Sequence, residues 1–241
     1  MMTLRIIARL LDYPDLALWE HQDELLAALE PACELDLHYS ALLMQFIRDL
    51  CARPLLDAQA DYCERFDRGR ATSLLLFEHV HGESRDRGQA MVDLMAQYRA
   101  DGLQIDSREL PDFLPLYLEY LASRSDEAAR EGLQDIAPIL ALLGARLHQR
   151  GCAYGVLFDI LLALSGSDIQ AQALKQQVVA EARDDTPQAL DAVWEEEQIK
   201  FLGEPQGCAC AQQTAHQRRF AGAVAPQYLD LSDALTGTKG R

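Results

Sequence analysis

The chain has 241 residues, 49% of them hydrophobic, which is enough length and apolar content for a folded core. It carries 38 acidic and 22 basic side chains, for a formal net charge of -16. This acidity opposes binding to nucleic acid and to anionic membrane surfaces, and it favours a partner with a basic segment.

The start of the chain does not fit a secretory signal, because its apolar run is broken by Arg9 and ends at Asp12. No window approaches the roughly 20 apolar residues that span a bilayer. We therefore expect a cytoplasmic protein without a membrane-inserted segment. In that reducing compartment its six cysteines are expected to be mostly free thiols.

The apolar residues recur with a helical period along most of the chain. The first predicted helix has its apolar face over residues 4–11, and Asp15 is expected to cap the second. Ser40 is expected to cap a third helix, and Pro54 separates it from a fourth that reaches Phe66.

Two glycines are expected to break the chain direction in the middle of the sequence, because glycine adopts left-handed conformations at little cost; they are Gly69 and Gly82. Ser84 is expected to cap a helix that Gly102 closes. Asp112 is expected to start the next helix, which tolerates its early proline in the first turn.

The later part of the chain continues the helical pattern. Pro138 either kinks a long helix or marks a new start, and residues 154–164 predict a buried helix. Asp168 is expected to begin another helix, and Thr186 followed by proline is typical of a helix start. From residue 203 onward, turn residues without a period predict a largely flexible tail.

Together these elements predict an all-α protein. We expect a single bundle of roughly nine to eleven helices over residues 1–202, followed by a mobile C-terminal tail over residues 203–241. The sequence lacks the nucleophile elbow, the Walker loop, the dinucleotide glycine pattern and the paired histidines of zinc proteases. An acidic helical bundle without these signatures is expected not to be an enzyme.

Two histidines beside an acidic residue form the most suggestive polar cluster: Glu78, His79 and His81. Such groups bind metals or move protons in other proteins. Residues two apart on a helix point to different faces, so His79 and His81 can chelate one ion only if Gly82 opens the backbone. The alternatives are two histidines stabilised at the negative end of a helix, or side chains that contact a bound peptide, and we expect the peptide contact over the metal site. Cys208 and Cys210 are one residue too close for the usual zinc pair, so we expect exposed thiols.

Five arginines gather in the centre of the sequence: Arg65, Arg68, Arg70, Arg85 and Arg87. Two interpretations are open. The guanidinium groups either grip the phosphates of an anionic cofactor or the carbonyls of a peptide, or they pair with the interleaved acidic residues and fix two helices. The near-equal charge of the stretch favours the ion-pair network for most of them.

A long central block, residues 62–94, closely resembles the signature of the nitrate reductase molybdenum cofactor assembly chaperones, the NarJ and NarW type. Further matching runs follow one another along the chain, at 10–14, 108–112, 114–121, 135–143, 181–197, 217–220 and 224–228. One position departs from the wider group, which often has Asp-His at a central helix start. Here the pair is Asp112-Phe113, so only the role of the aspartate carries over.

This resemblance implies an all-helical redox-enzyme maturation protein of nitrate respiration. Family members bind the apo catalytic subunit of respiratory nitrate reductase in the cytoplasm, partly through its N-terminal peptide. They keep it competent for insertion of the molybdenum cofactor, and of an iron–sulfur cluster, before it docks on the membrane. The chaperone binds no cofactor permanently and is not part of the final enzyme. Proteins of molybdenum cofactor biosynthesis are further expected partners.

We expect the client's N-terminal peptide to bind as an amphipathic helix in an apolar groove. The candidate walls of this groove are Phe66, Leu74, Phe77 and Tyr117. The candidate partners for its basic residues are Glu78, Glu83 and Asp112. The other candidate contacts are Arg70, Arg85, Arg87, His79 and His81. The alternative is a carrier that binds the molybdopterin guanine dinucleotide cofactor itself through the arginine cluster.

Overall fold

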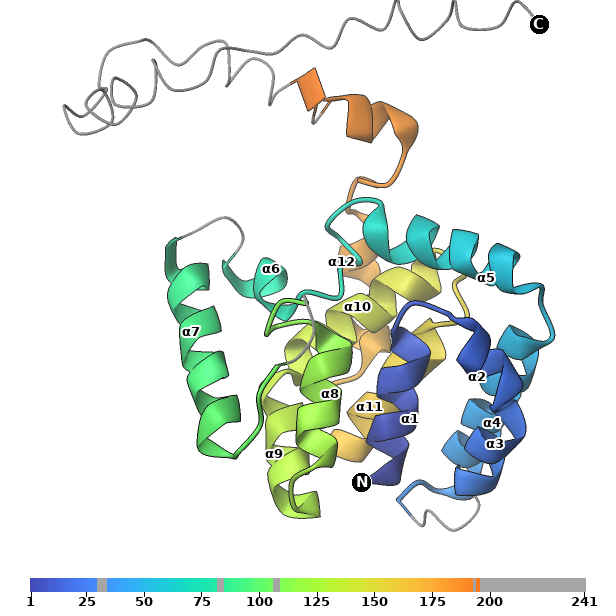
Figure 1. The fold of residues 1–241 in the computed structure, drawn as a ribbon. Coiled ribbons are helices and arrows are strands. Elements are labelled where there is room, and N and C mark those ends of the chain that lie inside the picture. Colours follow the sequence, from blue (N-terminus) through green and yellow to red (C-terminus); the bar gives the residue numbers. More distant parts are fainter. Residues whose placement is uncertain (30–33, 82–84, 106–108, 193, 196–241) are drawn as a thin grey trace, which may run out of the picture. The chain divides into compact units, whose positions relative to one another are not determined.

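The computed structural model describes residues 1–29, 34–81, 85–105, 109–192 and 194–195 (Figure 1). Of the described residues, 72% are helical, and ten helices among them have seven or more residues, so the predicted all-α class is confirmed. The only pairing of extended backbone within the described ranges is one antiparallel bridge between Leu75 and Phe113. Residues Met1–Leu190 form one compact unit. The predicted tail, 203–241, lies outside the described residues.

Twelve α-helices are labelled in Figure 1. Their bounds are α1 Met2–Leu11, α2 Leu16–Glu20, α3 Gln22–Leu29, α4 Leu37–Cys51, α5 Leu55–Tyr62, α6 Leu76–His81, α7 Arg85–Ala100, α8 Leu114–Ala122, α9 Asp126–Asp135, α10 Ala137–Gln149, α11 Gly155–Ser165 and α12 Lys175–Val179. A π-helical turn, Cys63–Asp67, extends α5, and a 3-10 helix, Ala171–Leu174, precedes α12. A further helical stretch begins at Pro187.

The core of the bundle lies between α1, α8, α10 and α11. Helix α10 packs along α11 and α1 packs along α8, as Figure 1 shows. Helix α11 is buried nearly all round, with Leu157, Phe158, Ile160 and Leu161 each fully shielded from solvent. Leucine-rich helices without a polar face bury apolar surface on every side, which explains why α11 occupies the centre of the bundle.

Most predicted helix starts are confirmed. The carboxylate of Asp15 accepts from Leu18 N at 3.0 Å, and Thr186 Oγ1 accepts from Ala189 N at 3.2 Å. Pro138 marks a new start, because α9 ends at Asp135 and α10 holds this proline in its first turn. Gly102, at a φ of 80°, closes α7 as predicted.

Besides the start at Asp112, which belongs to the candidate site, two predicted starts were wrong. Helix α4 begins one turn before Ser40, because Asp36 caps it by accepting from Tyr39 N at 2.9 Å. The segment after Asp168 stays extended, and the next helical residue is Ala171. Of the six cysteines, the three with described side chains, Cys51, Cys63 and Cys152, are free thiols. None of the described helices is long and apolar enough to cross a bilayer.

Helices α8 and α9 approach each other closely at Gly132. A Cβ added there would lie 2.4 Å from Leu121 Cδ2 and 3.1 Å from Tyr117 Oη. Gly132→Ala is therefore expected to lower the free energy of unfolding by about 1–3 kcal/mol through overpacking, as measured by urea denaturation. Gly88→Ala is the control, because a Cβ at that helical glycine meets nothing within 4 Å. An unchanged unfolding midpoint for Gly132→Ala would contradict the close approach.

Candidate functional site

The segment that leads into α6 is hydrogen-bonded to the segment that leads into α8. Leu76 N donates to Asp112 O at 2.9 Å, and Leu114 N donates to Leu74 O at 2.8 Å. These two bonds form the antiparallel bridge and place the first turn of α6 beside the start of α8. The bridge brings together two sequence blocks that lie more than thirty residues apart. Phe77 and Asp112, for example, are separated by 35 positions.

Asp112 is the buried anchor of this junction. Its side chain is 0% exposed, and its Oδ2 atom accepts from Phe77 N at 3.0 Å. The prediction that Asp112 starts its own helix was therefore wrong: α8 begins at Leu114 without a side-chain cap, and the carboxylate caps α6 instead. Burial raises the pKa of Asp112 above its ordinary value, against the lowering by the Phe77 amide and Arg87.

Arg87 extends this polar cluster from α7. Its Nη1 atom lies 3.3 Å from Glu78 Oε1, and its Nη2 atom lies 3.9 Å from Asp112 Oδ2. Arg65 likewise pairs with Asp61, with its Nε atom 3.2 Å from Oδ1. For these two arginines the structure supports the interpretation as internal ion pairs that fix neighbouring elements. Arg87 Nε and Asp112 Oδ1 are buried and have no hydrogen-bond partner among the described residues.

His79 is held by the loop before α6. Its Nε2 atom lies 2.8 Å from Ser73 O, so Nε2 carries the proton and donates to that carbonyl. Burial lowers the pKa of His79 below its ordinary value of 6.5. Across the described part of the chain, no three His, Cys, Asp or Glu side chains are grouped so as to hold a metal ion. His79 is thus a neutral hydrogen-bond donor that fastens α6 to its loop.

This protonation state predicts a pH dependence of stability. Because the pKa of His79 is lowered on folding, its contribution is present above about pH 6.5 and is lost as pH falls through the folded-state pKa. Urea denaturation between about pH 7.5 and about pH 5.5 is expected to show this loss, and His79→Gln is expected to flatten it. The glutamine keeps an N–H donor for Ser73 O without titrating. An equal slope in both proteins would contradict this assignment.

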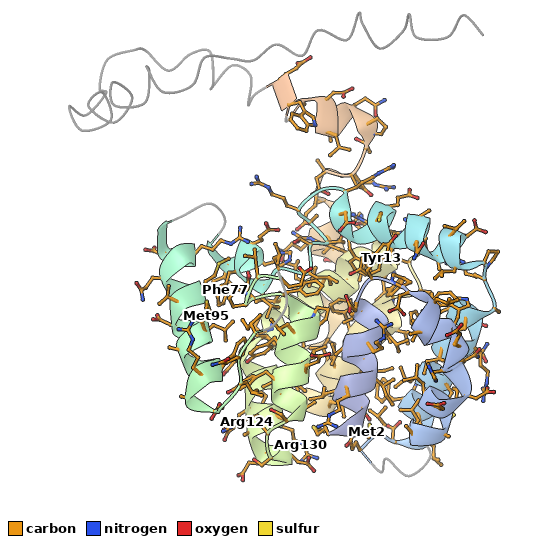
Figure 2. All side chains as sticks on the ribbon, in the orientation of Figure 1. Met2, Tyr13, Phe77, Met95, Arg124 and Arg130 are labelled. Carbon is orange, nitrogen blue, oxygen red and sulfur yellow. The ribbon has the colours of Figure 1, made fainter. Side chains whose placement is uncertain are left out.

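A groove opens beside α6. It has a volume of about 430 Å³ and runs between α6, α7, α8 and the α9–α10 junction. It is lined by Leu76, Phe77, Val80, Ala90, Asp93, Leu94, Gln97, Tyr117, Asp135, Ile136 and Ile139. Phe77 extends from α6 toward α7 (Figure 2). Most of the lining is aliphatic or aromatic, and its two charged members, Asp93 and Asp135, are both acidic.

The structure brings some predicted site residues together at this groove and separates others. Phe77 and Tyr117 line it, and Glu78 lies on the same short helix. Phe66 lies in the core instead, with its ring centroid 5.1 Å from that of Tyr154, and Leu74 is buried beneath the bridge. Arg70 is exposed on the loop that enters α6. The side chains of His81 and Arg85 are outside the described part of the structure, and so is the whole of Glu83.

Sequence reasoning missed several groove residues. Val80 and Ile139 supply apolar walls, and Asp93 and Asp135 supply the negative charge. The available signal was helical spacing: Val80 lies three positions after Phe77, and Ala90, Leu94 and Gln97 share one face of α7. That pattern is typical of core packing as well, so the sequence did not separate the groove from the core.

A second hollow of about 280 Å³ lies elsewhere in the bundle, between α4, α5 and the start of α11. Its apolar walls include Leu42, Phe46 and Val156. It contains none of the predicted site residues, so a substitution in its lining is a suitable control for a substitution in the groove.

A family model described as nitrate reductase delta subunit matches residues 19–159, which is more than half of the chain and includes every lining residue of the groove. The chain belongs to the nitrate reductase delta subunit family. The resemblance expected from the sequence is thereby confirmed.

Among relatives of this delta subunit family, the nitrate reductase molybdenum cofactor assembly chaperone NarJ of Escherichia coli K12 is 62% identical over 232 residues, covering 96% of this chain and 98% of the relative. The probable chaperone NarW of the same strain is 54% identical over 233 residues, with the same coverage. A probable NarJ of Bacillus subtilis is 34% identical over 102 residues, covering 42% of this chain and 55% of the relative. These relatives are named as assembly chaperones, which is a non-catalytic role.

Proposed function

We propose that this chain is an assembly chaperone for the catalytic subunit of a respiratory nitrate reductase. It binds the apo subunit in the cytoplasm, partly through the subunit's N-terminal peptide, and keeps it competent for molybdenum cofactor insertion before membrane docking. It is not part of the final enzyme and binds no cofactor permanently. The observation that carries the proposal is the apolar groove beside α6, in a chain 62% identical to a named chaperone of this kind.

The apolar lining of the groove suits a helical peptide. An amphipathic helix docks through apolar anchors at positions i, i+3, i+4 and i+7, which need a long, mostly apolar channel. The groove offers Phe77 and Val80 from one side and Ile136 and Ile139 from the other. Among the described side chains, α6 and α7 contribute few residues to the core, namely Leu76 from α6 and Leu94 and Tyr98 from α7.

The charge of the groove selects a basic peptide. Asp93 and Asp135 line it, and the whole chain has a net charge of -16. An acidic rim speeds the encounter with a basic segment and rejects acidic ones. Release of the client requires reversible binding, which a micromolar dissociation constant, about −8 kcal/mol, would allow.

The alternative, a carrier of the molybdopterin dinucleotide, needs arginines that are available for phosphates. Arg87 pairs with Glu78, and Arg65 pairs with Asp61. Two of the five clustered arginines are therefore already used inside the protein, which favours the peptide-binding role.

The proposal is tested by capture of the apo catalytic subunit on immobilised chaperone, with and without the subunit's N-terminal segment. Val80→Lys is the informative variant, because Val80 lines the groove and is 59% exposed. Val92→Lys is its matched control, because Val92 lies on α7, is 58% exposed and does not line the groove. We expect capture by the wild type and by Val92→Lys, and strongly reduced capture by Val80→Lys. Equal capture by all three would contradict the groove as the client site.

A further inference from the structure

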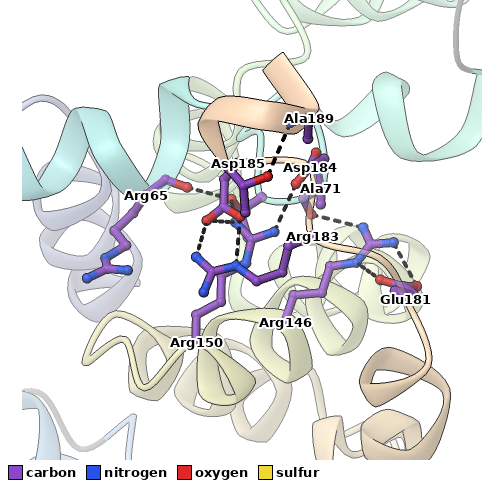
Figure 3. A network of polar contacts seen from close by, with 11 residues as sticks. Arg65, Ala71, Arg146, Arg150, Glu181, Arg183, Asp184, Asp185 and Ala189 are labelled. Carbon is purple, nitrogen blue, oxygen red and sulfur yellow. Dashed lines mark hydrogen bonds and ion pairs between the residues drawn. The ribbon is translucent and has the colours of Figure 1, made fainter. Parts of the chain in front are cut away.

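A short non-helical segment, residues 181–186, lies between α12 and the helical stretch that begins at Pro187. We call it the strap. Its acidic side chains pair with two arginines at the C-terminal end of α10, Arg146 in the last turn and Arg150 directly after the helix (Figure 3). The strap, α10 and the loop that enters α6 therefore share one network of polar contacts.

Arg146 joins the strap to this loop. Its Nε and Nη2 atoms donate to the two carboxylate oxygens of Glu181, at 2.7 Å and 3.0 Å. Its Nη1 atom donates to Ala71 O at 2.9 Å. A planar guanidinium that uses three of its N–H groups in this way fixes the relative position of its partners.

Arg150 makes the same connection one turn later, and its side chain is only 5% exposed. Its Nη2 atom lies 3.0 Å from Asp184 Oδ1, and its Nη1 atom lies 3.3 Å from Asp185 Oδ2. The same Nη1 atom donates to Thr72 Oγ1 at 3.1 Å. Asp185 is held in turn by Arg183, and this hydrogen bond lowers the pKa of Asp185. A buried charge with these partners is costly to leave unpaired.

Asp184 touches the loop backbone directly. Its Oδ2 atom accepts from Ala71 N at 2.7 Å (Figure 3). Gly69 has a φ of 81°, and a Cβ added there would lie 2.7 Å from Asp184 Cγ. The loop is thus shaped to let the strap carboxylate lie against its backbone, which only glycine allows at this position.

The loop leads straight to the groove. Thr72 is five positions before Phe77, and between them Ser73 O accepts from His79 Nε2 and Leu74 O accepts from Leu114 N. Helix α6 has only six residues, too few to be stable alone, so its position depends on these attachments. Its Phe77 and Val80 form one wall of the groove.

We propose that the strap is a latch that positions the α6 wall of the groove, with Asp184 and Arg150 as positioning residues for client binding. This inference rests on the proposed function. It means that a segment late in the chain controls the affinity of a groove that other helices form. While the strap is bound to the loop, the loop is held in place and the groove already has the conformation that binds the peptide. When the strap is released, α6 loses one of its attachments, and the peptide has to order the wall as it binds, which weakens its affinity.

The test compares Asp184→Ala with a matched aspartate variant, Asp36→Ala, in the full chain. Both carboxylates accept a backbone N–H bond, Asp184 from Ala71 and Asp36 from Tyr39, but Asp36 caps α4 away from the groove. Two quantities are measured: the affinity for a synthetic peptide of the nitrate reductase catalytic subunit's N-terminus, by titration calorimetry, and the hydrogen exchange of the Phe77 amide, by nuclear magnetic resonance.

We expect Asp184→Ala to weaken the peptide affinity by about tenfold and to speed exchange of the Phe77 amide by a similar factor, a typical size for coupling between two sites. Asp36→Ala is expected to change neither quantity, even where it lowers the global stability. Asp184→Asn keeps an oxygen for the Ala71 amide and should fall between the wild type and Asp184→Ala, a partial rescue that a general loss of stability would not give.

If Asp184→Ala keeps both the peptide affinity and the Phe77 amide exchange rate of the wild type, the strap does not position α6 and the proposal is wrong. A change in exchange without a change in affinity would also overturn it as a control of client binding. Failure of the wild type to bind the peptide would instead count against the proposed function, and the Phe77 exchange would still decide whether the strap positions α6.

Discussion

Asp112→Ala is expected to lower the free energy of unfolding by about 2–3 kcal/mol and to abolish binding of the client peptide. Removal of the carboxylate takes away the acceptor of the Phe77 amide, and among the described residues it leaves Glu78 as the carboxylate paired with Arg87. A buried N–H group without an acceptor destabilises the folded state by the full free-energy cost of its desolvation. We therefore expect the first turn of α6 to shift until this amide reaches another acceptor. The groove wall at Phe77 would move with it. Urea denaturation and titration calorimetry measure the two effects.

Asp112→Asn is the control for this prediction. The asparagine keeps an oxygen of the same size for the Phe77 amide, and it is neutral, so the burial that raises the pKa of Asp112 no longer opposes folding. We expect most of the stability and most of the peptide affinity to be retained. Equal losses in the alanine and asparagine variants would mean that the charge of Asp112, rather than its role as an acceptor for α6, is the essential property.

Phe77→Ala is expected to weaken peptide binding by about 2 kcal/mol or more, roughly thirtyfold in the dissociation constant, with a smaller loss of stability. Phe77 is partly exposed and is the one phenylalanine among the described residues that line the groove, and a large aromatic side chain buries much area against a docked helix. Titration calorimetry with the client peptide gives the affinity, and a parallel urea denaturation gives the stability.

Leu42→Ala is the matched control, because Leu42 is a partly buried residue that lines the other hollow, between α4, α5 and α11. It is expected to lose stability without losing peptide affinity. If Leu42→Ala weakens the peptide as strongly as Phe77→Ala does, the peptide does not bind specifically in the groove beside α6.

The helical class and most element boundaries were predictable, because period, caps and prolines are local signals. The side chains of Asp15, Ser125 and Thr186 each cap a helix by accepting from the amide three residues later. The cap of α6 was not predictable in this way, since Asp112 reaches it from 35 positions later in the chain. Ser40 and Asp36 are both good capping residues, and only the packing of α4 decides between them.

The site was predictable only in part, for a related reason. Phe66, Leu74, Phe77 and Tyr117 have the same apolar character and helical spacing, yet Phe66 and Leu74 lie in the core while Phe77 and Tyr117 line the groove. A period identifies a buried face, but it does not state whether another helix of the same chain covers that face. The strap network likewise joins arginines of α10 to acids more than thirty positions away, which no local pattern indicates.

The most direct test of the central claim is nuclear magnetic resonance titration of the isotope-labelled chain with a synthetic peptide of the catalytic subunit's N-terminus. We predict saturable one-to-one binding with shifts concentrated at Phe77, Val80, Leu94, Ile136 and Ile139, the residues that line the groove. Shifts concentrated at Leu42, Phe46 and Val156 around the other hollow, or no saturable shifts at all, would contradict the groove beside α6 as the client site.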